Sequence, residues 1–378
     1  MSPVSGRDIP GGDVAYTEAL LARPPEGVTY TTYVDALAEG MLVERGRRPK
    51  HGAMRGTDGL IFGARAVEIG LRKSGVMFRE PYRYLTVHPD AFDLIHAHVF
   101  PVRLIDTVLP LVTSSGFPLP VLYEDRCGWS HRHVVAATAA ERALSTLVGA
   151  EISWLPPRRA TRTMVQSIHY RDELISAGSD PGRVVVRTLG IQGESMVSHP
   201  IRPTTVGFIS TKFEEKGGAV VLAAFQKLLA EHPGARLVII GGGRRPCEIE
   251  ALGGSVTWMG TVTRQRVLDE LLTSIDVLAH PTRCDSGPPY VILEALQRGI
   301  PVVTSDLPWI DEGLTGPAVR RVPGEPSRVG EALLDLFQPD TYVKASTAAV
   351  DLWRTRYSME VVAELVGSTY REALATRL

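Results

Sequence analysis

Residues 276–304 read DVLAHPTRCDSGPPYVILEALQRGIPVVT, and this stretch decides the fold. Val277–Ala279 is a short apolar run typical of a buried strand. Pro288–Arg298 has the pattern of a helix, and Gly299 stands where glycine commonly ends one. Pro301–Thr304 is again a short β-type run. A strand, a helix and a second strand in this order predict a parallel β-α-β unit.

The residues before this stretch show the same alternation of strands and helices. The expected strands are Val206–Ser210, Ala235–Ile240 and Val256–Met259, and the expected helices are Ala219–His232 and Arg264–Ile275. Strands that alternate with helices of about 10–15 residues form a parallel sheet that is covered on both faces. The C-terminal half is therefore expected to be a doubly wound, Rossmann-like domain.

The N-terminal half alternates less regularly. Its expected strands are Val28–Val34, Asp93–Ala97, Pro120–Tyr123, Arg162–Gln166 and Arg183–Arg187, and its expected helices are Val14–Leu21, Glu141–Gly149 and Ile168–Ala177. Residues 190–204 contain two glycines and two prolines, which is typical of a linker. We expect an α/β protein with a first domain at 1–190, a second at 200–357, and a C-terminal helix at 358–378 that packs back on the first.

The start of the chain is unusual for a doubly wound domain, which normally opens with a strand. Here Gly11 and Gly12 follow closely after Met1. We expect that Met1 is not the true start and that about 5–8 strand residues precede it.

The composition argues against several classes of protein. The chain has 41 Lys and Arg and 42 Asp and Glu, and its net charge of −1 offers no attraction for nucleic acid. Cys127, Cys247 and Cys284 are far apart and form neither a disulfide framework nor a zinc-ligand spacing. There is no signal-peptide pattern and no apolar run of about 20 residues. We expect a cytoplasmic protein, with peripheral membrane contact left open.

A lysine and two glycines lie at the start of an expected helix. Lys216-Gly217-Gly218 follows the strand that ends near Ser210. An ammonium at this place can bind phosphate, and glycine lets the backbone approach a ligand closely. A solvated lysine in an ordinary turn is the alternative.

A second set of candidate ligand groups lies at the start of the helix after the next predicted strand. Gly287 permits close approach, and the positive end of a helix that begins near Pro288 favours an anion. Because proline has no N–H, phosphate would have to bind the amides of Gly287, Tyr290 or Val291.

Glu294 lies further along the same helix, among apolar residues. A carboxylate in such surroundings needs a partner, and the two hydroxyls of a ribose would provide one. An ion pair with Arg298 at position i+4 is the alternative.

Two further features of the N-terminal half have both a functional and a structural interpretation. Gly11-Gly12, just before the helix Val14–Leu21, would let the backbone reach into a cleft between the domains, or would simply form a tight turn. His96 and His98 lie on one face of a predicted strand and would bind zinc only if a third ligand joined them.

These motifs resemble those of the retaining glycosyltransferases of family 4. EKGG at 215–218, with HPGARLVIIGGG at 232–243, is similar to the lysine-glycine turn and the glycine-ended strand of that family. LEALQRGIPVVTS at 293–305 is similar to its C-terminal signature, and DLIHAH at 93–98 is similar to a strand of its N-domain. The resemblance is strongest from about 183 to 321. It implies the GT-B fold, in which two Rossmann-like domains face each other across a cleft.

The resemblance also implies roles for individual residues. Lys216 would bind the diphosphate of a nucleotide sugar and Glu294 its ribose, and His98 would lie beside the donor sugar. The amides around Gly287–Val291, together with Gly11-Gly12, would cap the phosphates. Lys216 and His98 would be the catalytic residues, and no metal or other cofactor would be needed.

Two positions depart from the family pattern. The family often has an arginine about five residues before the lysine, where this chain has Thr211 followed by Lys212. An ammonium would replace the guanidinium there without its bidentate geometry. The first of the two glutamates of the family corresponds to Ser286, with Asp285 beside it. The identity of the sugar is therefore not predicted.

The expected function is transfer of a hexose from a nucleotide-diphosphate sugar to an acceptor hydroxyl, with retention at the anomeric carbon, in glycan or glycoconjugate biosynthesis. The departures at Thr211 and Ser286 favour the alternative of a non-catalytic GT-B subunit or scaffold. A third hypothesis is another GT-B enzyme, such as a phosphorylase or a nucleotide-sugar epimerase.

Overall fold

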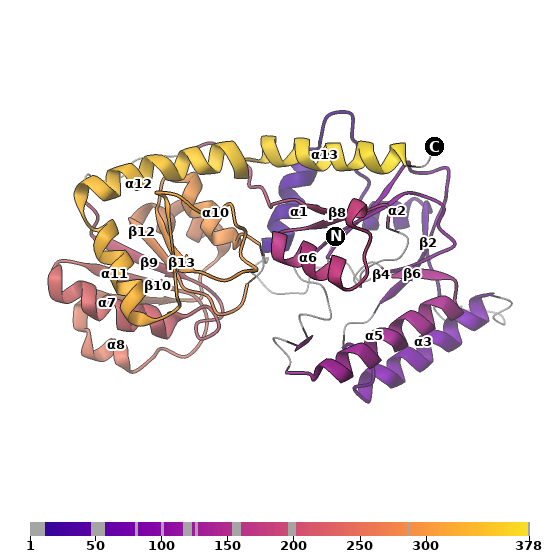
Figure 1. Cartoon of the computed structure of the whole chain (residues 1–378), viewed down its shortest axis with the longest axis horizontal. Coiled ribbons are helices and arrows are strands. Elements are labelled where there is room, and N and C mark those ends of the chain that lie inside the picture. Colours follow the sequence, from indigo (N-terminus) through magenta and orange to yellow (C-terminus); the bar gives the residue numbers. More distant parts are fainter. Residues whose placement is uncertain are drawn as a thin grey trace. The chain divides into compact units, whose positions relative to one another are not determined.

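The computed structural model describes residues 12–46, 57–79, 82–99, 102–115, 123–124, 128–152, 160–195, 202–285 and 287–376 (Figure 1). The chain forms two compact units. The first comprises Pro24–Arg187 and the residues of α13 (Met359–Ala375) from Glu364 onward, and the second comprises Thr188–Ala363 together with α1 (Gly12–Ala22). The bounds expected from the sequence, 1–190 and 200–357, group α1 differently and stay a prediction.

The second unit is built on a sheet of six parallel strands in the order β11-β10-β9-β12-β13-β14. The strands are β9 (Thr205–Ile209), β10 (Arg236–Ile240), β11 (Val256–Gly260), β12 (Val277–His280), β13 (Val302–Ser305) and β14 (Val319–Val322). The order reverses between β9 and β12, so their carboxyl ends border the crevice where doubly wound sheets bind ligands. The doubly wound architecture predicted for the C-terminal half is confirmed.

Helices cover this sheet because their apolar residues recur at helical spacing. The helices are α7 (Gly218–Glu231), α8 (Glu248–Ala251), α9 (Arg264–Arg266), α10 (Tyr290–Gln297), α11 (Pro326–Leu336) and α12 (Pro339–Leu352). Phe225 and Leu228 of α7 pack with Leu333 of α11 and Phe208 of β9 in one buried cluster. This core holds the carboxyl ends of the strands, and the loops that follow them, in fixed positions.

The first unit contains two four-stranded sheets. One is parallel and comprises β3 (Ile95–His98), β5 (Leu111–Ser115), β7 (Arg162–Val165) and β8 (Val184–Val186). The other is mixed and comprises β1 (Leu42–Glu44), β2 (Arg83–Val87), β4 (Val102–Ile105) and β6 (Ala150–Ile152). The helices are α2 (Tyr33–Ala38), α3 (Thr57–Lys73), α5 (His131–Leu147) and α6 (Ile168–Ser176).

Most expected elements are present within a few residues of their predicted ends, although α5 begins at His131, well before the expected Glu141. Two other expectations are wrong. Val28–Val34 is not a strand, because Thr32 caps α2 and its hydroxyl accepts from the amide of Asp35. The single helix expected at Arg264–Ile275 consists of α9, a π-helical turn at Val267–Leu271 and a 3₁₀ turn at Leu272–Ser274. Except for Tyr123, the strand expected at Pro120–Tyr123 lies outside the described residues.

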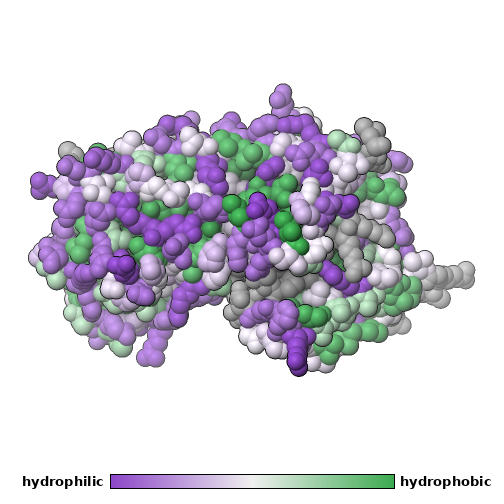
Figure 2. Space-filling view, in the orientation of Figure 1, coloured by the Kyte–Doolittle hydropathy of each residue, from purple (hydrophilic) through white to green (hydrophobic). Residues whose placement is uncertain are grey.

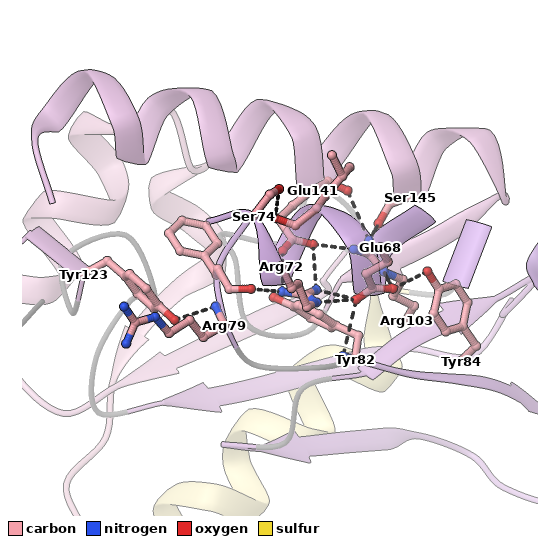
Figure 3. A network of polar contacts seen from close by, with 12 residues as sticks. Glu68, Arg72, Ser74, Arg79, Tyr82, Tyr84, Arg103, Tyr123, Glu141 and Ser145 are labelled. Carbon is pink, nitrogen blue, oxygen red and sulfur yellow. Dashed lines mark hydrogen bonds and ion pairs between the residues drawn. The ribbon is translucent and has the colours of Figure 1, made fainter. Parts of the chain in front are cut away.

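A network of charged side chains is buried between α3, α5 and β4 in the first unit (Figure 3). Arg72 of α3 donates to Glu68 on the same helix at 2.9 Å, and its Nη1 lies 2.9 Å from Glu141 Oε1 of α5. Arg103 of β4 pairs with Glu141 and donates to Ser145. Burial raises the pKa of Glu141 even though Arg103 and Arg72 oppose the rise. The two guanidiniums therefore neutralise the two buried carboxylates.

Apolar side chains are exposed on α3, although its buried face carries Glu68 and Arg72 beside Ile61 and Ala64. Leu60, Phe62, Val67 and Ile69 have exposed fractions of 39–55%. Apolar residues of this helix therefore lie at the surface as well as in the core, whereas those of a typical surface helix face the core. No helix among the described residues combines the length and the apolar character needed to cross a bilayer.

Replacing Arg103 by Met should lower the free energy of unfolding by about 3–5 kcal/mol, because two buried carboxylates would then share one guanidinium. Urea denaturation followed by circular dichroism measures this loss. Arg171→Met is the matched control, since Arg171 pairs with Asp172 at the surface and should change stability by no more than about 0.5 kcal/mol. Wild-type stability of Arg103→Met would contradict a structural role for the network.

Candidate functional site

The loops that follow β9 and β12 meet at the carboxyl edge of the second sheet. Gly217 ends the first loop with φ of +82°, and a Cβ there would lie 2.1 Å from the carbonyl oxygen of Pro281 in the second loop. Only glycine fits this contact, both in conformation and in space. The glycine of the lysine-glycine motif therefore holds two loops together, and Lys216 is carried to their junction.

Lys216 lies against the loop after β12. Its Nζ is 2.6 Å from Asp285 Oδ2 and donates to the carbonyl of Cys284 at 2.7 Å. The same carboxylate oxygen is 3.5 Å from His280 Nε2. Burial opposes ionisation of Asp285, but His280 and Lys216 outweigh it and lower the pKa of Asp285. The ammonium is thus already balanced by a carboxylate, and an anionic ligand would have to share it.

The start of α10 supplies amides beside this ion pair. Tyr290 and Val291 are the first two residues of the helix, where N–H groups have no acceptor within the helix. Gly287 has φ of +57°, and its amide donates to the carbonyl of Trp309 at 3.0 Å. That amide is therefore engaged, which leaves Tyr290 and Val291 as the better placed donors. Ser286 lies outside the described residues.

Glu294 is buried in α10, with an exposed fraction of 4%. Its carboxylate is paired with Arg264, the first residue of α9. Arg298, the alternative partner expected from the sequence, donates to the backbone carbonyl of Glu294 at 3.1 Å instead. Burial raises the pKa of Glu294, and Arg264 opposes the rise. The predicted alternative of an i+4 ion pair is wrong, and the ion-pair partner comes from another helix, α9.

Thr211 and Lys212, the residues expected to replace the arginine of the family, are both exposed. Lys212 Nζ donates to Glu215 at 3.0 Å. The structure therefore directs this ammonium to a neighbouring carboxylate, and a role in donor binding stays a prediction. Gly12 is the first residue of α1, and Gly11 lies outside the described residues.

His98 belongs to the first unit, at the end of β3. Its Nδ1 and the Nε2 of His96 each lie 2.7 Å from the hydroxyl oxygen of Ser114 on β5. His96 Nδ1 lies 2.6 Å from the hydroxyl of Tyr370 on α13. Burial lowers the pKa of His96 to about 4, and burial together with His96 lowers that of His98 to about 3. Both imidazoles are therefore neutral near pH 7.

The zinc alternative for His96 and His98 finds no support in the part of the chain that the structure describes. No group of three or more His, Cys, Asp or Glu side chains comes together there as a metal site would require. Ser114 lies between the two imidazoles, so the pair is explained by hydrogen bonding.

Sequence reasoning missed Arg264 and the ring of Tyr290. The guanidinium of Arg264 lies over that ring, 5.3 Å from its centre. One feature of the sequence could have indicated Arg264 as a site residue. It comes directly after the loop that follows a parallel strand. Because Arg264 and Glu294 are 30 residues apart, nothing in the local pattern indicated that they pair.

Comparison with known proteins identifies this architecture. Residues 203–338 match the family model described as Glycosyl transferases group 1. A phosphatidyl-myo-inositol mannosyltransferase of Mycolicibacterium smegmatis is 28% identical over 220 residues, which span 55% of this chain and 56% of that protein. The alignment thus covers only about half the length of this curated relative.

Two solved structures share the fold across most of both chains. Anabaena HepE in complex with UDP has a TM-score of 0.53 at 16% identity, over 82% of this chain and 81% of that chain. A glycosyltransferase from Rickettsia africae has a TM-score of 0.52 at 12% identity, over 96% and 93%.

The two Rossmann-like units and these structural neighbours define a GT-B fold. Within it, residues 203–338 are the domain that matches the glycosyl transferases group 1 model. This domain contains Lys216, Asp285 and Glu294, so the candidate site lies inside the segment that carries the family match.

The stability of the protein should fall as the pH drops below about 6.5, the ordinary pKa of histidine. The pKa values of His96 and His98 in the folded state, about 4 and about 3, lie below that value. Between these limits the unfolded chain binds more protons than the folded one. Each histidine therefore removes up to about 1.4 kcal/mol of stability per pH unit.

Urea denaturation of His96→Gln at pH 6 and pH 5 tests this origin. The slope of the unfolding free energy against pH should shrink by about 1.4 kcal/mol per unit, because one titrating group is gone. His131→Gln is the matched control, because the side chain of His131 is 79% exposed. An unchanged slope in His96→Gln would show that the acid sensitivity arises elsewhere.

Proposed function

We propose that the chain is a cytoplasmic glycosyltransferase that moves a hexose from a nucleotide-diphosphate sugar to an acceptor hydroxyl, with retention, in glycan or glycoconjugate biosynthesis. The group 1 domain supports the transferase class. HepE, a structural neighbour, is bound to UDP and glucose in one crystal structure and to UDP-glucose in another. Those ligands are the basis for proposing a nucleotide-sugar donor here.

The observation that carries the proposal is the meeting of three kinds of group at the switch point of the second sheet. Lys216 follows β9 and supplies a cation. The first amides of α10 follow β12, and Glu294 lies one turn further into the same helix. A diphosphate needs the first two, and a ribose needs the carboxylate. A nucleoside diphosphate is the ligand that uses all three.

In the proposed reaction, negative charge develops on the departing diphosphate. The Lys216 ammonium and the amides of Tyr290 and Val291 would stabilise that charge, so the proposal requires no metal or other cofactor. His98 would contact the donor sugar as a neutral hydrogen-bonding group, because an imidazole with its pKa lowered to about 3 carries no charge near pH 7.

One observation favours the second candidate, a GT-B subunit that does not catalyse transfer. Asp285 already neutralises Lys216, 2.6 Å away, and would repel a diphosphate at the same place. A nucleotide must overcome this repulsion, which the additional donors of α10 can help to offset. Nucleotide binding therefore separates the two candidates.

We also propose that the exposed apolar side chains of α3 and α5 contact an acidic lipid surface. Val135 and Leu147 of α5 are also exposed, with fractions of 54% and 59%. Figure 2 shows this apolar surface at the lower right, over α3 and α5.

Basic residues border this apolar face where the two helices adjoin. His133 near the start of α5 bonds the carbonyl of Gly75 just after α3, at 2.7 Å. Lys73, Arg79 and Arg132 are exposed at these adjoining ends. Apolar side chains bordered by cations suit the interface of a membrane that contains anionic lipids.

The proposed donor site predicts that UDP, GDP or ADP stabilises the protein against heat. A nucleotide at 100 times its Kd adds about 2.7 kcal/mol of stability, which thermal shift detects as a raised Tm. Lys216→Ala should abolish most of this shift and lower turnover of the matching radiolabelled nucleotide sugar by about ten- to a thousandfold. Lys227→Ala is the matched control, because Lys227 lies on α7 in an exposed pair with Glu331. No response to any nucleotide would favour the non-catalytic subunit.

The lipid surface predicts that the protein sediments with vesicles of phosphatidylcholine and phosphatidylglycerol at low salt, and less at high salt. Leu60→Asp combined with Val67→Asp should reduce the bound fraction at least about tenfold, because the two positions lie on one side of α3 and two charges would enter the interface. Val343→Asp on α12 is the control, because Val343 is similarly exposed, at 46%. Vesicle binding unaffected by the double variant would exclude this face as the contact.

A further inference from the structure

The carboxyl group of Glu294 lies in a place where a charge is costly. The side chain lies in α10 among buried neighbours that include Leu293 and Ala295. Burial raises the pKa of Glu294, so without compensation the carboxyl would tend to take up a proton. A protonated carboxyl has one acceptor oxygen fewer for the two hydroxyls of a ribose. The proposed ribose contact therefore depends on whatever keeps Glu294 ionised.

Arg264 is the group that compensates this charge. It is the first residue of α9, whose start is fixed by Thr263, because the Thr263 hydroxyl accepts from the amide of Arg266. From there the Arg264 guanidinium reaches the Glu294 carboxylate and donates to Oε1 through Nη2. The Arg264 side chain is 25% exposed, whereas that of Glu294 is 6% exposed. The arginine thus reaches a buried carboxylate from the solvent side.

The ring of Tyr290 holds the guanidinium in this position. The Tyr290 hydroxyl donates to the carbonyl of Gly190 at 3.2 Å, which fixes the ring. The guanidinium of Arg264 lies over the ring at 5.3 Å from its centre. A planar cation on an aromatic face loses little freedom when it pairs with a carboxylate. One face of Arg264 is therefore supported by an aromatic ring while its nitrogens contact Glu294.

The other charged groups near Glu294 do not replace Arg264. Arg298 lowers the pKa of Glu294, but its guanidinium donates to backbone carbonyls of Glu294 and Leu268, each at 3.1 Å. Asp269 acts on Arg298, and Glu18 of α1 acts on Tyr290. Of these charged groups, Arg264 is the one that bonds directly to the Glu294 carboxylate.

We infer that Arg264 is a positioning residue that keeps the Glu294 carboxylate ionised and oriented toward the ribose of the donor nucleotide. The inference rests on the proposed function, since it deepens the role of the same site. It adds a residue of α9 to the lysine and helix terminus, and it assigns Tyr290 a side-chain role as the platform for that residue. The diphosphate contacts do not depend on this pair.

The dependence of nucleotide affinity on pH tests the inference. The Kd of whichever of UDP, GDP and ADP stabilises the wild-type protein most is measured by calorimetry between pH 6 and pH 9. Arg264→Met should weaken binding about tenfold or more at pH 6 and recover toward the wild-type value as the pH rises. The ratio of variant to wild-type Kd cancels the titration of the nucleotide itself.

Four further proteins separate positioning from a general loss of structure. Arg266→Met is the matched control, because Arg266 lies on the same helix and pairs with Glu270 at the surface. The ratio of its Kd to that of the wild-type protein should stay near one. Arg264→Lys should restore part of the affinity. Glu294→Gln should bind weakly at every pH, and the double variant Arg264→Met with Glu294→Gln should bind no worse than Glu294→Gln alone.

Inorganic pyrophosphate, which has no ribose, provides a second readout. Its binding should be equal in Arg264→Met and the wild-type protein, whereas Lys216→Ala should weaken it. A ratio for the nucleotide that does not change with pH, or an equal loss of pyrophosphate binding, would overturn the inference and leave the proposed function standing. A wild-type protein that binds none of the three nucleotides would overturn both.

Discussion

The second unit depends on the contact between two loops that follow neighbouring parallel strands. The loops after β9 and β12 can touch only because position 217 has no side chain, since a Cβ there would meet the carbonyl of Pro281. This contact places Lys216 against Asp285 and continues along the chain into α10, which carries Glu294. The cation, the helix start and the carboxylate are therefore parts of one packed arrangement.

The sequence predicted the architecture of the second unit well because each of its signals is local. Short apolar strands, helices with periodic apolar residues and glycines after helix ends are properties of neighbouring residues, and parallel order follows from their alternation. Lys216 and Glu294 could be selected as candidates for the same reason. The partners of these residues could not, because Asp285 and Arg264 reach them from other loops, 69 and 30 residues away.

The first unit was harder to predict because its local signals conflict with its packing. α3 turns Glu68 and Arg72 inward beside Ile61 and Ala64, and it leaves Leu60, Phe62, Val67 and Ile69 exposed. Apolar side chains alone therefore do not mark the face that packs on the core. The β-branched and aromatic run from Thr31 to Val34 indicated a strand, but a hydroxyl cap at Thr32 starts a helix there. The short strands of the mixed sheet, such as β1 and β6, contain too few residues for an alternation of apolar and polar side chains to be recognised.

The chain passes between its two units at three places in the described residues, Arg23 to Pro24, Arg187 to Thr188 and Ala363 to Glu364. Neither unit is therefore one uninterrupted segment. A recombinant fragment that ends at 187 lacks Tyr370, whose hydroxyl contacts His96. A fragment that begins at 188 lacks α1 and keeps the final residues of α13 without the unit on which they pack. Intact halves would require circular permutation or co-expression of the missing pieces, because a single proteolytic or genetic cut always leaves one unit incomplete.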